Sequence, residues 1–477
     1  MRSHTVEKIG GTSMSHFAAV HNNIIQPRSE TLYQRIFVVS AYAGVTNDLL
    51  EHKKSGQPGI YALYTNAESE QAWREALIQL RHKLLHLNEE LFDDSAQLAM
   101  ANRFIGQRLD DTEVVLDNLY SLCQHGHFAM TDHLLRVREM LASLGEAHSG
   151  WNTAHLLQNV GINARFVDLT GWHADEMLPL DEVITRAFAD IDLDYEMPIV
   201  TGYAHCREGL MASFDRGYSE MTFSRIAVVT EAREAIIHKE YHLSTADPNI
   251  VGQASVVAIG RTNYDVADQL ANLGMEAIHP RAAKGLRQQS IPLRVKNTFE
   301  PEHGGTLITG DYVSDKPCVE IIAGRQHLHA IELFDQDMVG IIDEYEQRVQ
   351  QIFRRYKAPI ITKDSNANTL THFLSCNLKT VKRIISTLSE LYPGADIIHR
   401  KVAIVSAIGS DMQVPGLLAR AVNALAERSI SVLAMHQSMR QVDMQFIVDS
   451  NDYQGAVQAL HSQLIEPHDY GTAICAA

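Results

Sequence analysis

The stretch Val6-Glu7-Lys8-Ile9-Gly10-Gly11-Thr12-Ser13 decides the fold of this chain. It predicts a short β-strand that delivers a lysine, breaks at two glycines and opens a helix at two hydroxyl residues. The glycines let the backbone approach a ligand closely, a helix N-terminus offers unpaired N–H groups, and Lys8 adds a positive charge. The stretch is therefore a candidate anion site. On these eight residues alone, a tight turn with a helix cap is the simpler interpretation, and because the lysine precedes the glycines this is not a P-loop.

The same strand-to-glycine pattern returns along the chain. Arg35–Ser40 is a β-branched and aromatic stretch that leads into Ala41-Tyr42-Ala43-Gly44 and a helix cap. Further strands are predicted, with helices between them, at 163–168, 197–202, 255–259 and 292–297. This alternation predicts an α/β fold with a mainly parallel sheet covered on both faces, in which ligands bind at the carboxyl ends of the strands.

Two regions depart from that alternation. Residues 68–143 contain almost no glycine or proline and predict two or three long helices. After about residue 310, a strand–helix–strand–strand–helix pattern occurs twice, which indicates an internal structural repeat. Because the repeat holds no concentration of nucleophiles or phosphate loops, we expect it to bind or regulate.

Composition excludes several classes of protein. With 477 residues, 45% hydrophobic and 21% charged, the chain suits a globular protein of two to four domains. No apolar run is long enough for a bilayer and no signal peptide is evident, so no membrane partner is expected. Five scattered cysteines fit a reducing cytoplasm. A net charge of −17 argues against nucleic acid, and the 24 histidines show no metal-ligand spacing.

Two further stretches place charged side chains beside small residues at predicted loop–helix junctions. They are Leu144–Gly150, which contains Glu146, and Phe214–Glu220, which contains Arg216. A guanidinium can bind a substrate carboxylate at two points, and a carboxylate can hold an amine. Each stretch taken singly fits a capped helix with a surface ion pair better.

Taken together, six stretches resemble the aspartate kinases of the amino-acid kinase superfamily in order and spacing. They are Lys8–Ser13, Val39–Asn47, Gly145–Ser149, Asp215–Glu220, Thr245–Pro248 and Gly274–Pro280. The C-terminal repeat is similar to the paired ACT domains of that family. The resemblance implies an α/β/α sandwich over residues 1–312 with a helical insert at 68–143, followed by βαββαβ-like ACT domains at 319–395 and 400–466 and a tail at 467–477.

The resemblance also implies a reaction: ATP and L-aspartate give ADP and 4-phospho-L-aspartate. Lys8 is the expected catalytic residue, and Mg²⁺ would be carried by the nucleotide phosphates without protein ligands. The residues expected to bind aspartate are Thr46, Glu146, Arg216, Ser219 and Glu220. Those expected to bind the nucleotide are Lys8, Gly10, Gly11, Ser13, His238, Lys239, Ser244, Asp247, Pro248 and Glu276. The ACT domains imply a homodimer or a higher homo-oligomer.

The nucleotide segment departs from the family pattern. Positions that hold a threonine, an aspartate and a tyrosine in relatives are His238, Lys239 and Ser244 here, and a family lysine is Glu276. One hypothesis is a reciprocal charge exchange in which Lys239 and Glu276 face the same nucleotide pocket and Lys239 serves the phosphates. The alternative is that the pocket has lost these contacts and binds ATP weakly or prefers another nucleotide.

Overall, the departures resemble the specialised aspartate kinases that accompany ectoine synthesis. Two other functions stay open from the sequence. One is a kinase for another amino-acid carboxylate, such as glutamate. The other is a catalytically weak amino-acid sensor that keeps the kinase fold.

Overall fold

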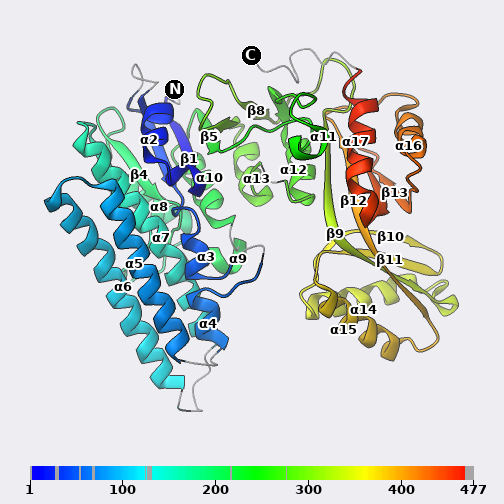
Figure 1. The fold of residues 1–477 in the computed structure, drawn as a ribbon, viewed down its shortest axis with the longest axis horizontal. Helices are drawn as coiled ribbons and strands as arrows, with labels where there is room; N and C mark the ends of the chain where they lie inside the picture. Colours follow the sequence, from blue (N-terminus) through cyan, green and yellow to red (C-terminus); the bar gives the residue numbers. More distant parts are fainter. Residues whose placement is uncertain are drawn as a thin grey trace. The chain divides into compact units, whose positions relative to one another are not determined.

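The computed structural model describes residues 3–26, 32–52, 55–66, 70–123, 125, 131–214, 217–275 and 277–467. They form two compact units (Figure 1). Unit 1 takes in Met1–His242 and Ile278–Gly310, and unit 2 takes in Leu243–Ala277 and Asp311–Ala476. Residues 243–277 therefore group with the C-terminal half, although the predicted kinase domain runs unbroken to residue 312. The predicted domain boundaries stay a prediction, and nearly all of the predicted tail lies outside the described residues.

Unit 1 is built on a mainly parallel sheet, as the sequence predicts. Its central strand, β1 (Thr5–Ile9), pairs in parallel with β2 (Arg35–Val39) on one side and β5 (Glu234–Lys239) on the other. Within the unit the strand order is β3-β4-β2-β1-β5-β7-β8, and only the β7–β8 pair is antiparallel among these described strands. The outer strands are β3 (Ala164–Val167), β4 (Met197–Thr201), β7 (Leu293–Asn297) and β8 (Thr306–Thr309). The carboxyl ends of the parallel strands thus meet at one edge.

Helices pack against this sheet and against one another. α7 contacts β2, β3 and β4, whereas α10 contacts β1, β2 and β5. The helices of unit 1 with five or more residues are α3 (Val45–Leu49), α4 (Ile60–Asn66), α5 (Glu70–Leu91), α6 (Ser95–Cys123), α7 (Thr131–Asn159), α8 (Leu180–Phe188), α9 (Leu210–Phe214), α10 (Tyr218–Val229) and α13 (Pro280–Gln288). None of the described helices is both long and apolar enough to cross a bilayer.

The long helices α5, α6 and α7 lie side by side (Figure 1) and confirm the prediction of two or three long helices in this region. The predicted loop–helix junction at Leu144–Gly150 is wrong, because α7 continues through it to Asn159. Its glycines serve close packing. A Cβ on Gly145 would lie 2.6 Å from the Ala41 Cβ, and one on Gly150 would lie 2.9 Å from the Phe166 ring.

Unit 2 contains a six-stranded sheet of order β10-β11-β9-β12-β14-β13. Helices α14 and α15 share one apolar cluster with β9 and β11, while α16 and α17 share another with β12 and β14. The strands are β9 (Ile321–Phe334), β10 (Ile360–Asn366), β11 (Thr369–Leu374), β12 (Asp396–Ile408), β13 (Ala434–Gln437) and β14 (Asp443–Asp449). The helices are α11 (Pro248–Val251), α12 (Tyr264–Asn272), α14 (Ile342–Arg355), α15 (Leu378–Leu391), α16 (Leu417–Glu427) and α17 (Tyr453–Leu464), and a short strand, β6 (Arg261–Asn263), also belongs to this unit.

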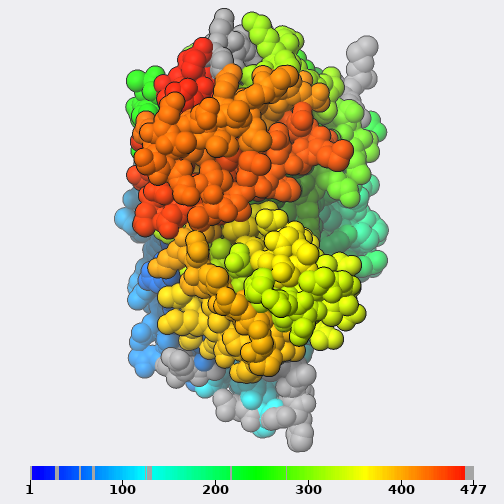
Figure 2. Space-filling model, turned by 90° about the vertical axis from the view of Figure 1, so that its right-hand side faces the viewer, coloured from blue at the N-terminus to red at the C-terminus, as the bar shows by residue number. Residues whose placement is uncertain are grey.

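The two repeats share their long central strands. The first part of β9, Ile321–Arg325, pairs with Ile404–Ile408 of β12, whereas Leu328–Phe334 pairs with Asp396–Val402. The first residues of the predicted first repeat therefore complete the sheet of the second repeat. Figure 2 shows the two repeats as adjacent lobes: the first is yellow to light orange, and the second is orange to red. The strand predicted at 255–259 is wrong, since that segment contributes only an isolated bridge from Ala258 to Ser244.

A buried ion cluster holds β1 to both of its neighbours. The Glu7 carboxylate accepts hydrogen bonds from Arg35 Nε at 2.7 Å and Nη2 at 3.0 Å, and lies 2.7 Å from His238 Nε2. Arg35 also donates to the carbonyls of Ile24 and Ile25. Burial alone would raise the pKa of Glu7, yet Arg35 and His238 hold it well below its usual value. The carboxylate is thus charged and fully partnered inside the protein.

We expect Glu7→Gln to lower the free energy of unfolding by about 3–5 kcal/mol, because it leaves the Arg35 guanidinium buried without its countercharge. The urea midpoint at neutral pH measures this loss. Glu234→Gln is a matched control on β5, since its bridge to Arg294 is partly exposed and should cost about 1 kcal/mol or less. Equal losses in the two variants would contradict the assignment.

Candidate active site

The predicted anion loop forms directly after β1. The last hydrogen bond between this end of β1 and β5 runs from the Gly10 N–H to the His238 carbonyl at 3.2 Å. The short helix α1 (Gly11–Met14) begins at the next residue. A Cβ on Gly11 would lie 2.7 Å from the Ala41 carbonyl oxygen, so only glycine allows this approach of the loop after β1 to the loop after β2. The buried Ser13 hydroxyl lies 2.8 Å from that of Thr298.

Lys8 is the charged group beside this loop. Its side chain is 10% exposed, and its Nζ lies 3.7 Å from Glu220 Oε1 on α10. The other oxygen of Glu220 accepts a 2.6 Å hydrogen bond from the His279 N–H. Burial opposes ionisation of Glu220, but Lys8, Lys239 and the His279 N–H together lower its pKa. Lys8, Lys239 and Glu220 thus form one electrostatic group at the carboxyl edge of the sheet.

Glu146 is the most unusual group in this region. It lies on α7 with 2% of its surface exposed, and its Oε2 has no hydrogen-bond partner among the described residues. Burial raises its pKa well above the usual value, although Lys8, the Tyr218 side chain and the Tyr203 backbone act in the opposite direction. Oε2 lies 3.1 Å from the position of a Cβ on Gly202. An orphaned buried carboxyl oxygen costs stability unless a ligand supplies a donor.

Close contacts between backbones gather these groups. Gly202, at the end of β4, has no room for a side chain, since a Cβ would lie 2.7 Å from that of Ser219 and 2.8 Å from the Val39 carbonyl oxygen. A Cβ on Gly217, just before α10, would lie 2.6 Å from the His279 ring. The ends of β2 and β4 and the start of α10 therefore converge on one small region.

The structure assembles part of the predicted site. Lys8, Gly10, Gly11 and Ser13 follow one another along the loop, Glu220 pairs with Lys8, and Glu146 and Lys239 interact electrostatically with that pair. Ser219 lies on α10 and is buried beside Gly202, and Thr46 lies on α3 and is half-buried.

The other predicted residues divide into three cases. The His238 side chain is paired with Glu7, and the register of β1 with β5 puts it on the opposite face of the sheet from Lys8. Ser244, Asp247 and Pro248 belong to unit 2, where the Asp247 carboxylate caps α11 and Ser244 bonds to the Ala246 carbonyl. Arg216 and Glu276 lie outside the described residues.

Sequence analysis missed two contacts in this region. The hydroxyl of Thr298 beside Ser13 comes from the segment after β7, and the backbone N–H of His279 binds Glu220. The contact of His279 could have been anticipated, because the proline that follows it marks the start of a helix. Nothing in the local sequence around Thr298 predicts its contact with Ser13.

No group of three or more metal-ligating side chains gathers within the described ranges. Glu220, the carboxylate beside the loop, is paired with Lys8.

Comparisons with known proteins define the class. The amino acid kinase family matches residues 4–297 and an ACT domain matches 405–464. The chain therefore belongs to the amino acid kinase family.

Similar proteins show where in this family the chain belongs. Aspartate kinase Ask_Ect of Stutzerimonas stutzeri (strain A1501) is 56% identical over 476 residues, which cover 99% of this chain and 100% of the relative. Two structures of E. coli aspartokinase III share the fold, each covering 97% of this chain and 100% of its own. They are the complex with lysine and aspartate (T-state; TM-score 0.72, 19% identity) and the complex with aspartate and ADP (R-state; TM-score 0.69, 18% identity). Within the family, this chain is thus one of the aspartate kinases.

We expect Glu146→Gln to raise the melting temperature, by an amount that grows between about pH 5 and pH 8. The folded-state pKa of Glu146 is raised, so the stability linked to its protonated form is complete below the unfolded pKa and is lost as pH rises through the folded value. Gln does not titrate and avoids that loss. Calorimetric scans of both proteins across this range measure the difference.

Glu139→Gln is the matched control on the same helix. Its carboxylate accepts hydrogen bonds from the Tyr203 hydroxyl and from the Met211 and Ala212 N–H groups, so this substitution should lower the melting temperature. A fall for Glu146→Gln at every pH would contradict the assignment of a strained carboxyl.

Proposed function

We propose that the chain transfers the γ-phosphoryl group of ATP to the β-carboxylate of L-aspartate, giving ADP and 4-phospho-L-aspartate. The observation that carries this proposal is that two groups interact electrostatically in one region: Lys8 beside the glycine loop, and Glu146, whose Oε2 has no hydrogen-bond partner among the described residues. The first suits a transferring phosphoryl group and the second suits a substrate ammonium. The 56% identity to an aspartate kinase over nearly the whole chain supports the choice of acceptor.

The chemistry requires positioning more than proton transfer. A carboxylate is already ionised at neutral pH and attacks phosphorus without a general base. Lys8 would neutralise charge that develops on the transferring group, and the loop of Gly10 and Gly11 would offer backbone N–H groups to phosphate. Mg²⁺, carried by the nucleotide, supplies further charge neutralisation when bound.

Substrate recognition would fall to the charged residues around the loop. Glu146 would accept the aspartate ammonium, which would give its Oε2 a donor and lower its pKa. By resemblance, Arg216 would hold a carboxylate, with Thr46 and Ser219 beside it. Glu220 stands where the family has aspartate, so its contact with substrate would be shifted by one methylene.

Release of ADP with aspartate, glutamate or no acceptor tests the proposed reaction. We expect turnover with aspartate to exceed that with glutamate at least about 100-fold, because an extra methylene displaces the attacking oxygen from its aligned position. Faster turnover with glutamate would favour a kinase for another carboxylate. The absence of acceptor-dependent turnover would favour an amino-acid sensor.

Substitution of the two lysines should separate chemistry from nucleotide binding. Lys8→Ala should lower kcat by about 10²–10³, because its charge acts most strongly on the transition state. Lys239→Ala should instead raise the ATP KM about tenfold, since it would remove a phosphate contact. Steady-state kinetics with each substrate varied distinguishes these effects, and Lys401→Ala in unit 2 is the control. A normal kcat for Lys8→Ala, or an unchanged ATP KM for Lys239→Ala, would disprove the corresponding role.

We also propose three features of the wider setting. The product would feed ectoine synthesis, a proposal supported by the resemblance and by the similarity to Ask_Ect. The ACT-like unit would join subunits into a homodimer or a higher homo-oligomer and respond to an amino acid. A cytoplasmic location stays a prediction from the scattered cysteines.

A further inference from the structure

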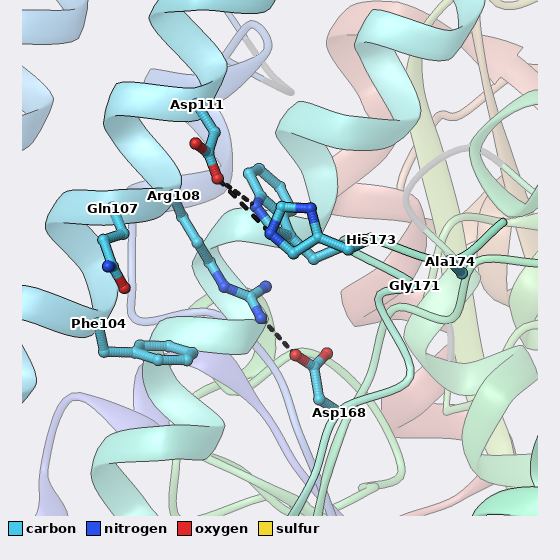
Figure 3. Close-up of a pocket in the computed structure, with 9 residues that line it drawn as sticks. Phe104, Gln107, Arg108, Asp111, Asp168, Gly171, His173 and Ala174 are labelled. Atoms are coloured by element: carbon cyan, nitrogen blue, oxygen red, sulfur yellow. Dashed lines mark hydrogen bonds and ion pairs between the residues drawn. The ribbon is translucent and has the colours of Figure 1, made fainter.

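A separate cavity of about 540 Å³ lies in unit 1 between α6 and the loop that follows β3 (Figure 3). α6 lines it with Phe104, Gln107, Arg108 and Asp111, and the loop lines it with Asp168, Gly171, Trp172, His173 and Ala174. The order β3-β4-β2-β1 puts β3 three strand positions from the strand of Lys8, roughly 14 Å away at ordinary strand spacing. The cavity is therefore distinct from the phosphate loop, although both lie at the carboxyl edge of the sheet.

Arg108, which lines the cavity, is held by an ion pair, a hydrogen bond and two aromatic rings. Arg108 is 7% exposed, bonds to Asp168 through Nη2, and donates to Thr170 Oγ1 at 3.1 Å through Nη1. Its guanidinium also lies 4.8 Å from the ring centroid of Phe104 and 4.9 Å from that of Trp172. Because its charge is already neutralised and held in place, this arginine is not poised to take an anion.

Asp111 leaves the cavity with an excess of negative charge. Its Oδ2 accepts a 2.8 Å hydrogen bond from Trp172 Nε1 and lies 3.9 Å from His173 Nε2. Its Oδ1 has no hydrogen-bond partner among the described residues, and the side chain is 48% exposed. Figure 3 shows this carboxylate facing His173, while the Arg108 side chain points toward Asp168. Two carboxylates thus share the cavity with one guanidinium.

The wall opposite α6 is fixed in place. Gly171 has φ +61°, and a Cβ there would lie 2.8 Å from that of His205. Just before it, the Leu169 N–H donates to Thr201 Oγ1 at 3.0 Å. The loop is therefore tied to the chain at the end of β4, and the cavity is formed in advance of any ligand.

We propose that this cavity binds a small organic cation, with an ammonium or amidinium group on Asp111 and a compact carbon skeleton against Trp172. A carboxylate oxygen without a donor suits a charged N–H group, and the adjacent aromatic edge suits an apolar body. The Gln107 amide at the rim can bind a second polar group. This inference does not depend on the reaction proposed above.

Fluorine NMR of the full chain labelled with 5-fluorotryptophan tests the proposal. The chain contains three tryptophans, so three signals are expected, and Trp172→Phe identifies the relevant one. The probes are propylammonium and, at matched size and ionic strength, propionate, each added to about 50 mM because so small a probe should bind weakly. Propylammonium should shift the Trp172 signal saturably, whereas propionate should not.

Asp111→Asn keeps the size of the side chain and should weaken propylammonium binding at least about fivefold by removing the charge. Asp110→Asn, on the exposed side of the same helix, should leave binding unchanged. The signals of buried Trp73 and Trp151 report whether each variant keeps its fold. No saturable shift, an equal shift with propionate, or unaltered binding in a folded Asp111→Asn protein would overturn the proposal. The comparison of the two probes on the unaltered chain requires no variant.

Discussion

The alternation of side chains along β1 is the constraint on which unit 1 depends. Glu7 points to one face and joins Arg35 and His238, while its neighbour Lys8 points to the other face and meets Glu220. Because β1 is paired along its whole length on both sides, this division is firmly set. A slip of one residue would bury Lys8 against Arg35 and remove the positive charge from the loop.

The two faces of β1 differ in how well their polar groups are satisfied. Around Glu7 every charge has a partner, whereas the buried Oε2 of Glu146 has none among the described residues. Natural proteins tolerate such an imbalance at sites that bind ligands. The fully paired cluster around Glu7 thus lies on one face of the sheet, and the unsatisfied Glu146 carboxyl group lies near Lys8 on the other. A substrate ammonium would supply the hydrogen-bond donor that Glu146 lacks.

The sequence predicted the groups whose signals are local or belong to an ordered set of motifs. The loop after Lys8, the long helices at 68–143 and the roles of Glu146 and Glu220 as site candidates were accessible in this way. The conformation at Gly145–Gly150 was not, because glycine suggests a break and only the packing against Ala41 and Phe166 explains a continuous helix.

Other features depend on how distant strands pair. The position of His238 suggests a nucleotide contact, but its register with Ile9 decides which face it occupies. The sharing of β9 and β12 by both repeats is likewise a property of the sheet as a whole. The cavity at Arg108 joins a helix to a loop some 60 residues away in the chain, and neither segment alone carries a signal for it.

The shared strands of unit 2 have a mechanical consequence. A single hydrogen-bond ladder runs through both halves, so neither half can rotate freely without twisting the other. The ladder loses its regular register between Val402 and Ile404, opposite the segment that contains His327 with φ +59°. A register irregularity of this kind bends a strand locally, so it would limit how much of a twist imposed at one end of the sheet reaches the other end.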